Sequence, residues 1–400
     1  MFCQLDTLRR CPGSSIRKAL NELPNSLDDT YERMLQGIPK EVSELAGRLF
    51  QCMVATLRPL RVEELAEIFA IEFGPNNVPK LVPSWRPVNS EEAILSTCST
   101  FITITGDEGS KFVQFSHFSV KEYLTSDRLQ TSTIGNIGQY YITLEPAHAI
   151  LAQACVSLLL QLDENEDEGR FRALPLASYA TTNWLRHAQF GDVSSRIQGS
   201  LAYLFDPRRP HFTSRILWRD VKDSFPVRPT CFDEPDSVTP LFFVAVCGFS
   251  EPARHLVVTH ALDVNTKCAH HGISPLHGPS ISGHVGSSRI LLDHGANVNA
   301  QDDNDWTPLH IASAFGHLGV AQLLLKRKAN SNARTKDNDT PLCLAAENGH
   351  LEIVRLLLDD GGDVTIRGCH DLTPHQIATE RGHDDVAQLL SGIRRQGTRE

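Results

Sequence analysis

Several signals that would place the chain in a common functional class are missing from its sequence. The ten cysteines are scattered and form no Cys-x-x-Cys pair, so neither a disulfide framework nor a common zinc motif is expected. The net charge is −10, and the one short basic run is Lys326-Arg327-Lys328. This balance argues against broad binding to nucleic-acid phosphates, which needs a dense Lys/Arg face. We expect no metal, no cofactor and no nucleic-acid partner.

Long apolar segments are also missing. The first residues contain no apolar core of a signal peptide. The longest apolar stretch, residues 149–162, is too short to span a bilayer and includes Gln153 and Gln161. The sequence therefore predicts a cytoplasmic protein that does not bind membranes.

Two motifs typical of enzymes are absent as well. No Gly-x-x-x-x-Gly-Lys-[Ser/Thr] loop is present to hold a triphosphate, and no Gly-x-Ser-x-Gly turn presents a nucleophilic serine. One interpretation of a short segment is a catalytic set of Ser116, His117 and Glu122. The simpler one is that Ser116 caps a helix, with Phe115 and Phe118 packed below it. We expect that the chain is not an enzyme.

A short motif of Thr or Ser followed by Pro recurs in the C-terminal part of the sequence. Successive copies are 35, 33, 33 and 33 residues apart, and nine residues after each copy comes a glycine followed by Phe or His. The copies are Thr239-Pro240-Leu241, Ser274-Pro275-Leu276, Thr307-Pro308-Leu309, Thr340-Pro341-Leu342 and Thr373-Pro374-His375. Thr or Ser suits a helix N-cap and Pro suits the first helical position, so each copy predicts the start of a helix.

This spacing closely resembles that of ankyrin repeats, which have a period of about 33 residues. The resemblance implies five repeats over residues 238–393, with a linker at 226–237 before them and a tail at 394–400 after them. The turn before each cap is called a finger; from the second repeat on, the fingers are residues 267–273, 301–306, 334–339 and 367–372. Two residues before each of these caps stand residue types that tolerate a left-handed backbone: Gly272, Asp305, Asn338 and Asp371.

The second and third repeats depart from the pattern. Pro279 should remove a hydrogen bond from the first helix of the second repeat, which costs up to about 3 kcal/mol. The next helix begins Val285-Gly286-Ser287-Ser288, which is poor in helix formers. We therefore predict a weak joint there. Lys328 stands where the third repeat would have glycine, at a cost of about 1 kcal/mol if the left-handed conformation is kept.

Ankyrin stacks bind proteins through their fingers and concave face, and two aromatic residues are candidate anchors there. Trp306 precedes the cap of the third repeat, and Phe315 ends the first helix of that repeat. Trp is enriched in binding hot spots, although packing on the neighbouring finger is an equal alternative for Trp306. The other candidates are polar finger residues, expected to be exposed and to form a rim: His271, Asp303, Asn304, Lys336, Asp337, Asp339 and His370.

The clustered and recurring histidines are expected to be structural residues. A metal site is one alternative for Cys268, His270, His271 and His277, but the spacing matches no common zinc pattern. The histidine after the recurring glycine appears in four of the five repeats, at His284, His317, His350 and His383. A residue repeated in this way is expected to be structural.

The first 235 residues are predicted to be mainly helical. Helical spacing of apolar residues occurs over residues 41–56, 62–71 and 91–99. Residues 101–105 and 111–115 are predicted to pair as strands across a turn. Helices followed by a two-stranded wing predict a winged helix over residues 39–130, with a helical connector over residues 131–225.

Four segments of this part resemble the region that follows the nucleotide-binding domain in fungal NACHT–ankyrin proteins. These proteins are signal-transducing NTPases of the STAND class, and the same winged-helix segment is named after GPI inositol-deacylase. The segments are residues 3–11 (CQLDTLRRC), 27–33 (LDDTYER), 58–66 (RPLRVEELA) and 114–124 (QFSHFSVKEYL). The resemblance covers residues 1–215 and implies that residues 1–38 are a remnant of the NTPase lid.

The two resemblances together predict a mainly α protein: a winged helix plus helical connector followed by an ankyrin-repeat solenoid. They imply that the chain binds an unidentified protein partner as the sensor or adaptor part of a NACHT-type signalling switch, with self-association through the N-terminal region as a further option. An alternative is a fragment of a P-loop NTPase whose catalytic domain is missing. A nucleic-acid-binding winged helix is less favoured, because residues 91–99 carry two carboxylates and no Lys or Arg.

Overall fold

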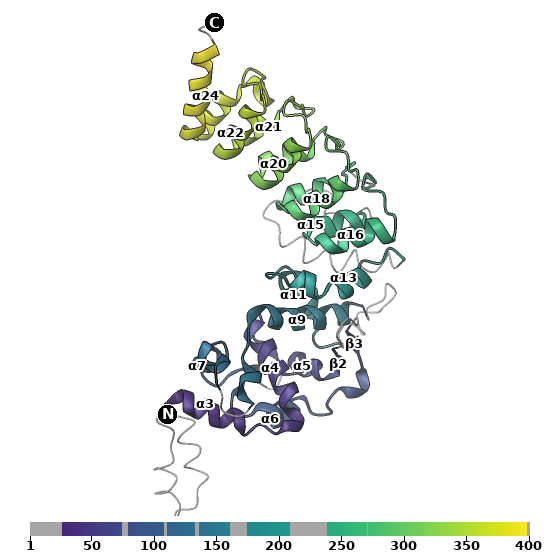
Figure 1. Cartoon of the computed structure of the whole chain (residues 1–400), viewed down its shortest axis with the longest axis vertical. Helices are drawn as coiled ribbons and strands as arrows, with labels where there is room; N and C mark the ends of the chain where they lie inside the picture. The colour runs from purple at the N-terminus through teal and green to yellow at the C-terminus, as the bar shows by residue number, and fades with distance from the viewer. Residues whose placement is uncertain are drawn as a thin grey trace, which may run out of the picture. The chain divides into compact units, whose positions relative to one another are not determined.

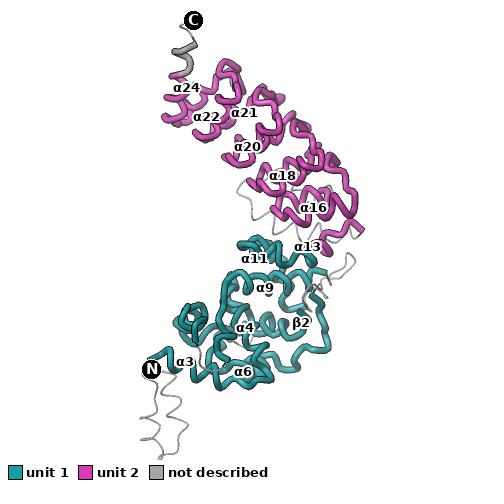
Figure 2. Tube along the Cα trace, in the orientation of Figure 1, with its two compact units in different colours: residues 1–200 teal, residues 201–400 magenta. Residues whose placement is uncertain are grey.

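The computed structural model describes residues 26–73, 79–107, 110–132, 136–160, 174–208, 238–269 and 271–397. The chain forms two compact units, residues 1–200 and residues 201–400 (Figures 1 and 2). Regular structure is mainly helical in both units, which confirms the predicted fold class. The expected linker at residues 226–237 and residues 1–25 of the expected lid remnant lie outside the described residues.

The first unit contains a winged helix. Its helices are α4 (Ser43–Ala55), α5 (Val62–Ala66) and α6 (Ser90–Cys98), and its strands are β1 (Leu60–Arg61), β4 (Ile102–Thr105) and β5 (Phe112–Phe115). The strands form an antiparallel sheet in the order β1-β5-β4, with Ile104 opposite Val113 and Leu60 also paired with Val113. The predicted wing is therefore confirmed. Strand β1 has only two residues, so no alternation in the sequence could reveal it.

Further short elements surround the winged helix. They are α3 (Leu27–Gln36), β2 (Ile71–Glu72) paired with β3 (Lys80–Leu81), α7 (Phe118–Leu124) and α8 (Asp127–Gln130). Short 3₁₀ helices lie at Lys40–Val42, Glu67–Ala70, Pro83–Trp85 and Ile137–Tyr140. Within the described part of the chain, no helix has the length and apolar character needed to cross a membrane.

The expectation that Ser116 caps a helix is wrong. His117 caps α7, and its Nδ1 accepts a hydrogen bond from the backbone N–H of Ser119 at 3.3 Å. His117 has the extended backbone of an N-cap, and an imidazole nitrogen can serve as the acceptor there. Phe118 is 71% exposed and therefore does not pack below the cap.

A long helix connects the winged helix to a further helix of the first unit. Helix α9 (Leu144–Leu159) packs against α4 and against α11 (Ala177–Ala188). Ten of the sixteen residues of α9 are buried, which explains the long apolar stretch in the sequence. The short helices α12 (Val193–Arg196) and α13 (Gln198–Leu204) follow.

The described residues of the second unit form five pairs of helices. They are coloured green to yellow in Figure 1. The pairs are α15 (Pro240–Val246) with α16 (Ser250–Thr259), α17 (His277–Ser282) with α18 (Val285–Asp293), α19 (Pro308–Ala314) with α20 (Leu318–Lys326), α21 (Pro341–Glu347) with α22 (Leu351–Asp359), and α23 (Pro374–Arg381) with α24 (Asp384–Gly397). The first helix of each repeat packs on the first helix of the next repeat, and second helices pack on second helices. Helix α24 continues through residues 394–397, which were expected to belong to the tail.

The motif residues perform the predicted local roles. The hydroxyl of Thr239 accepts a hydrogen bond from Phe242 N at 3.2 Å, and the hydroxyl of Thr340 accepts one from Cys343 N at 3.3 Å. The turn residues before the caps have the expected left-handed backbone, with φ between 60° and 66°: Gly272, Asp305, Asn338 and Asp371. Gly316 ends its helix with a φ of 78°.

Helix α17 accommodates Pro279 by starting late. It begins at His277, whereas the corresponding helices of the other repeats begin at the proline of the motif. Pro279 has no N–H to offer the Pro275 carbonyl, and Gly278 N reaches that carbonyl at 3.3 Å in a tighter turn. A Cβ atom at Gly278 would lie 3.1 Å from the Phe242 carbonyl, so α15 and α17 approach closely. The weak joint stays a prediction about stability.

The first repeat is covered by an aromatic residue from the segment before it. Phe205 follows α13, and its ring lies 5.6 Å from that of Phe243 and 6.1 Å from that of Phe249. All three side chains are buried. The end of the expected connector thus contributes to the core of the second unit, and the boundary of the repeats stays a prediction.

Candidate protein-binding surface

The fingers of neighbouring repeats are joined by hydrogen bonds between backbone atoms. Asp303 N donates to the His271 carbonyl at 3.0 Å, and Lys336 N donates to the Asn304 carbonyl at 3.1 Å. The side chains of Asp303, Asn304 and Lys336 are exposed. Because backbone atoms make these two links, the three side chains are available for contacts outside the stack.

Trp306 and Phe315 lie half-buried in the third repeat. Trp306 N donates to Asp302 Oδ1 at 2.8 Å, and the Trp306 ring lies 6.2 Å from the ring of His310. The Phe315 ring lies 6.3 Å from that of His317. Each ring therefore has packing on one side and exposed area on the other, as an anchor would need. Their role as anchors stays a prediction.

The polar residues expected at the rim do not all behave alike. Asp337 is exposed, as expected, and His271 is half-buried. The expectation that Asp339 is exposed is wrong: Asp339 is 7% exposed, and its Oδ1 accepts a hydrogen bond from Cys369 N at 2.8 Å. Burial raises the pKa of the Asp339 carboxyl group. The side chain of His370 lies outside the described residues.

Buried histidines connect each finger to the next repeat. His277 Nδ1 accepts from Ser274 N at 3.2 Å, so its Nε2–H is free to donate to the Trp306 carbonyl at 3.1 Å. His310 repeats this arrangement with Thr307 N at 3.1 Å and the Asp339 carbonyl at 3.1 Å. Burial lowers the pKa of both histidines, that of His310 to about 4. Both therefore remain neutral, and their hydrogen bonds hold each finger against the next repeat.

The histidines after the recurring glycines also link repeats, as expected for structural residues. Each Nε2 lies near a carbonyl at the end of the preceding repeat's first helix: His317 with Ile281 at 2.8 Å, His350 with Ala314 at 3.1 Å and His383 with Glu347 at 3.0 Å. These bonds hold the helix ends of successive repeats at one spacing.

Asparagines between the second helix and the next finger form a ladder that the sequence analysis did not identify. The side-chain oxygens of three of them accept backbone N–H groups of the next repeat at 2.8 Å: Asn265 from Asn297, Asn299 from Asn330, and Asn332 from Asp363. A signal for the ladder is present in the sequence, since Asp263-Val264-Asn265 recurs as Asn297-Val298-Asn299 and Asn330-Ser331-Asn332. Its spacing is that of the repeats.

The residues of the suggested metal site have other partners. Both ring nitrogens of His277 are used within the stack, and Cys268 is buried. His270 lies outside the described residues. Within the described residues, no three His, Cys, Asp or Glu side chains gather to hold a metal ion.

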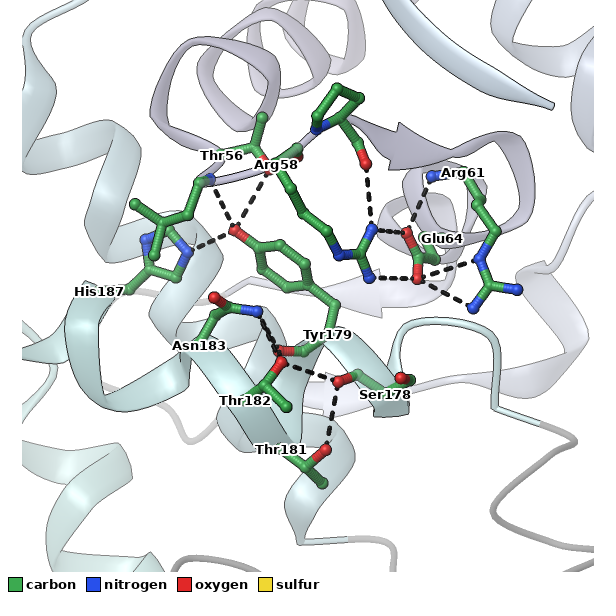
Figure 3. A network of polar contacts seen from close by, with 12 residues as sticks. Thr56, Arg58, Arg61, Glu64, Ser178, Tyr179, Thr181, Thr182, Asn183 and His187 are labelled. Carbon is green, nitrogen blue, oxygen red and sulfur yellow. Dashed lines mark hydrogen bonds and ion pairs between the residues drawn. The ribbon is translucent and has the colours of Figure 1, made fainter. Parts of the chain in front are cut away.

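A group of polar contacts in the first unit joins the winged helix to α11 (Figure 3). The Tyr179 hydroxyl accepts from Leu57 N at 3.2 Å and lies 2.7 Å from His187 Nε2. His187 Nδ1 lies 2.7 Å from His148 Nδ1. Burial lowers the pKa of His187 to about 3 and also lowers the pKa of His148. These contacts connect α4, α9 and α11 through neutral groups.

An ion pair lies beside this network. Arg58 makes two hydrogen bonds of 2.7 Å to Glu64, which is 1% exposed, and its guanidinium lies 5.0 Å from the centre of the Tyr179 ring (Figure 3). Burial opposes ionisation of Glu64, but the hydrogen bonds from Arg58 and Arg61 N hold the pKa of Glu64 below its usual range. Arg58 therefore pairs with α5 through its charge and contacts α11 through the Tyr179 ring.

The fold and these contacts define two known classes of domain, ankyrin repeats in the second unit and a winged helix in the first. Residues 276–325 and 329–396 match models of ankyrin repeats, and residues 31–134 match the winged helix domain of GPI inositol-deacylase. This combination agrees with the NACHT-associated architecture expected from the sequence. Ankyrin repeats support a role in protein–protein interaction and are typically non-catalytic.

The chain is also similar to a curated protein, the azaphilone pigments biosynthesis cluster protein L of Monascus ruber. The two are 28% identical over 296 residues, which make up 70% of this chain and 61% of the relative. The chain thus spans less than two thirds of the length of that relative.

Proposed function

We propose that the chain is a non-catalytic protein-binding component whose ankyrin repeats recognise a partner protein through their fingers and first helices. The observation that carries this proposal is the linkage of the fingers by backbone hydrogen bonds, which leaves polar side chains exposed beside two half-buried aromatic rings. Aromatic anchors surrounded by a polar rim are the usual anatomy of a protein interface.

We further propose that the chain is the cytoplasmic sensor or adaptor part of a NACHT-type switch. The order of a GPI inositol-deacylase-type winged helix before ankyrin repeats supports this role. The name of the relative in Monascus ruber refers to membership of a pigment biosynthesis cluster and to no reaction. A non-catalytic role is compatible with that name.

A second candidate function is that the chain is a fragment of a P-loop NTPase whose catalytic domain is missing. It is favoured by the same order of domains and would be supported by an in-frame upstream P-loop.

Nucleic-acid binding by the winged helix is disfavoured by charge. Helix α6 carries Glu91 and Glu92, and the nearby Lys111 forms an ion pair of 2.7 Å with Glu91. Salt-sensitive retention of DNA by the chain would favour nucleic-acid binding instead.

Replacement of the two aromatic residues tests the binding proposal. We expect Trp306→Ala and Phe315→Ala each to weaken capture of partner proteins by about 1 kcal/mol or more, roughly fivefold in affinity. The immobilised chain is exposed to a lysate, and retained proteins are quantified by mass spectrometry against the unchanged chain.

A matched control is Val258→Ala on α16, because Val258 is an apolar residue that is 62% exposed on a second helix. Its replacement should leave capture unchanged, and thermal melting should show that all three variants fold. Equal retention by the Trp306 and Phe315 variants and the unchanged chain would rule out these anchors.

A further inference from the structure

A cavity of about 240 Å³ lies between the fourth and fifth ankyrin repeats. It is lined by Glu347 of α21, Cys369 and Leu372 of the last finger, and Ile377, Glu380 and Arg381 of α23. All of these residues belong to a finger or to a first helix. The cavity therefore lies on the surface through which the repeats are proposed to bind a partner.

The charged groups at this cavity have an excess of negative charge. Arg381 forms an ion pair with Glu347, which leaves no cation for the second carboxylate of the lining. Glu380 is exposed, and among the side chains that the structure describes, which exclude residues 393–397, none forms an ion pair with it. The carboxylate of Asp339 lies just behind the wall, since its Oδ1 accepts from Cys369 N at 2.8 Å. Three carboxylates thus accompany one guanidinium.

The pKa of the Cys369 thiol is affected by this excess of negative charge. Burial raises the pKa of Cys369 to about 11, and the carboxylates of Asp339 and Glu347 add to the rise. A neighbouring negative charge disfavours the thiolate in the same way as it favours a bound cation. The local field therefore attracts cations and repels anions.

The rest of the wall is apolar. Ile377 is buried and Leu372 is half-buried. Lys and Arg side chains combine a long apolar stem with a charged head, and they bind well where apolar surface lies next to a carboxylate. An acidic side chain would face the three carboxylates, and like charges across an interface cost affinity.

We propose that this cavity receives a lysine or arginine side chain of the partner protein. The stem lies against Leu372 and Ile377, and the charged head pairs with Glu380. This inference rests on the proposed function and adds the chemistry of the partner: a basic side chain presented by an exposed segment that docks on the last two fingers.

Synthetic peptides test the inference on the full chain. Four sets of 12-residue peptides carry Arg, Lys, Leu or Glu at a fixed central position and mixtures elsewhere. We expect the chain to retain the Arg and Lys sets several-fold more than the Leu and Glu sets. Glu380→Gln should weaken binding of the Arg set about fivefold, as expected for loss of about 1 kcal/mol from a partly exposed charge pair. The bound Arg peptides should also slow alkylation of Cys369, with Cys369→Ser identifying the labelled site.

The control is Glu352→Gln, which removes a 69% exposed carboxylate from α22, the second helix of the fourth repeat. It should leave binding of the Arg set unchanged. A preference for Leu peptides, or an Arg preference that survives Glu380→Gln, overturns the inference while the binding function of Trp306 and Phe315 still stands. Failure of all four sets to bind also overturns it, and the capture experiment with the Trp306 and Phe315 variants then decides the proposed function separately.

Discussion

Lys328 shows how one backbone conformation affects stability. It follows α20 with a φ of 68°, a region that side chains other than glycine enter at a cost. Ala329 N closes the turn by donating to the Leu324 carbonyl at 3.0 Å, so the conformation is held by the helix end and not by the lysine side chain. Lys328 itself is exposed.

We expect Lys328→Gly to raise the free energy of unfolding by about 1 kcal/mol, because glycine adopts positive φ without strain. The matched control is Lys326→Gly. Lys326 is also exposed but lies in the helical backbone of α20, where glycine should destabilise by about 1 kcal/mol. Urea unfolding followed by circular dichroism measures both. A change of the same sign in the two variants would show that the φ of Lys328 is not the cause.

Single residues differ in how far the sequence reveals their roles. The left-handed turns at Asp305 and Asn338 were predictable because the preference of Asn and Asp for this conformation is local. The burial of Asp339 was not, because it depends on the backbone of Cys369, thirty positions away in the next finger. Residue type predicts local conformation, whereas burial of a polar group depends on what packs against it.

Elements of the first unit are held together by one tyrosine hydroxyl. The Tyr179 hydroxyl of α11 is the partner of Leu57 N, which follows α4, and of His187 Nε2. Without it, the buried His187 Nε2 would lose its partner, which costs about 1–3 kcal/mol. We therefore expect Tyr179→Phe to lower the stability of the first unit by that amount, measured by calorimetry of the full chain.

Tyr141→Phe is the control for this change. Tyr141 belongs to the same unit and is half-buried, and among the described residues its hydroxyl has no hydrogen bond. The same loss of one oxygen should therefore have little effect there. Equal shifts of the melting transition in the two variants would contradict a structural role for the Tyr179 hydroxyl.

At the scale of elements, helices with strong periodicity were the easiest to predict. Residues 41–56 and 91–99 correspond to α4 and α6 within one or two positions. The late start of α17 was not foreseen, because Pro279 was expected to remove a hydrogen bond from the helix and not to shift its first turn. The cavity beside Glu380 could not be predicted either, since its walls come from three segments that only stacking brings together.

At the scale of the whole molecule, buried neutral histidines occur in both units. Burial lowers the pKa of His187 to about 3 in the first unit and that of His310 to about 4 in the second. In the unfolded chain both histidines titrate near the ordinary value of about 6.5. The unfolded chain therefore binds more protons than the folded one below pH 6.5, and both units lose stability as the pH falls from 6.5 toward the folded pKa values.

We expect each of these histidines to remove about 1.4 kcal/mol of stability between pH 7.5 and pH 5.5, because one pKa unit corresponds to that energy. Calorimetry of the full chain at the two pH values measures the loss, and Tyr179→Phe identifies the transition of the first unit.

The control is His310→Gln. Gln376 already plays the corresponding role in the fifth repeat, where its Oε1 accepts from Thr373 N at 3.0 Å without titrating. The second unit of this variant should lose about 1.4 kcal/mol less than the unchanged chain over the same interval. An equal loss in the two proteins would mean that His310 is not a source of the acid sensitivity.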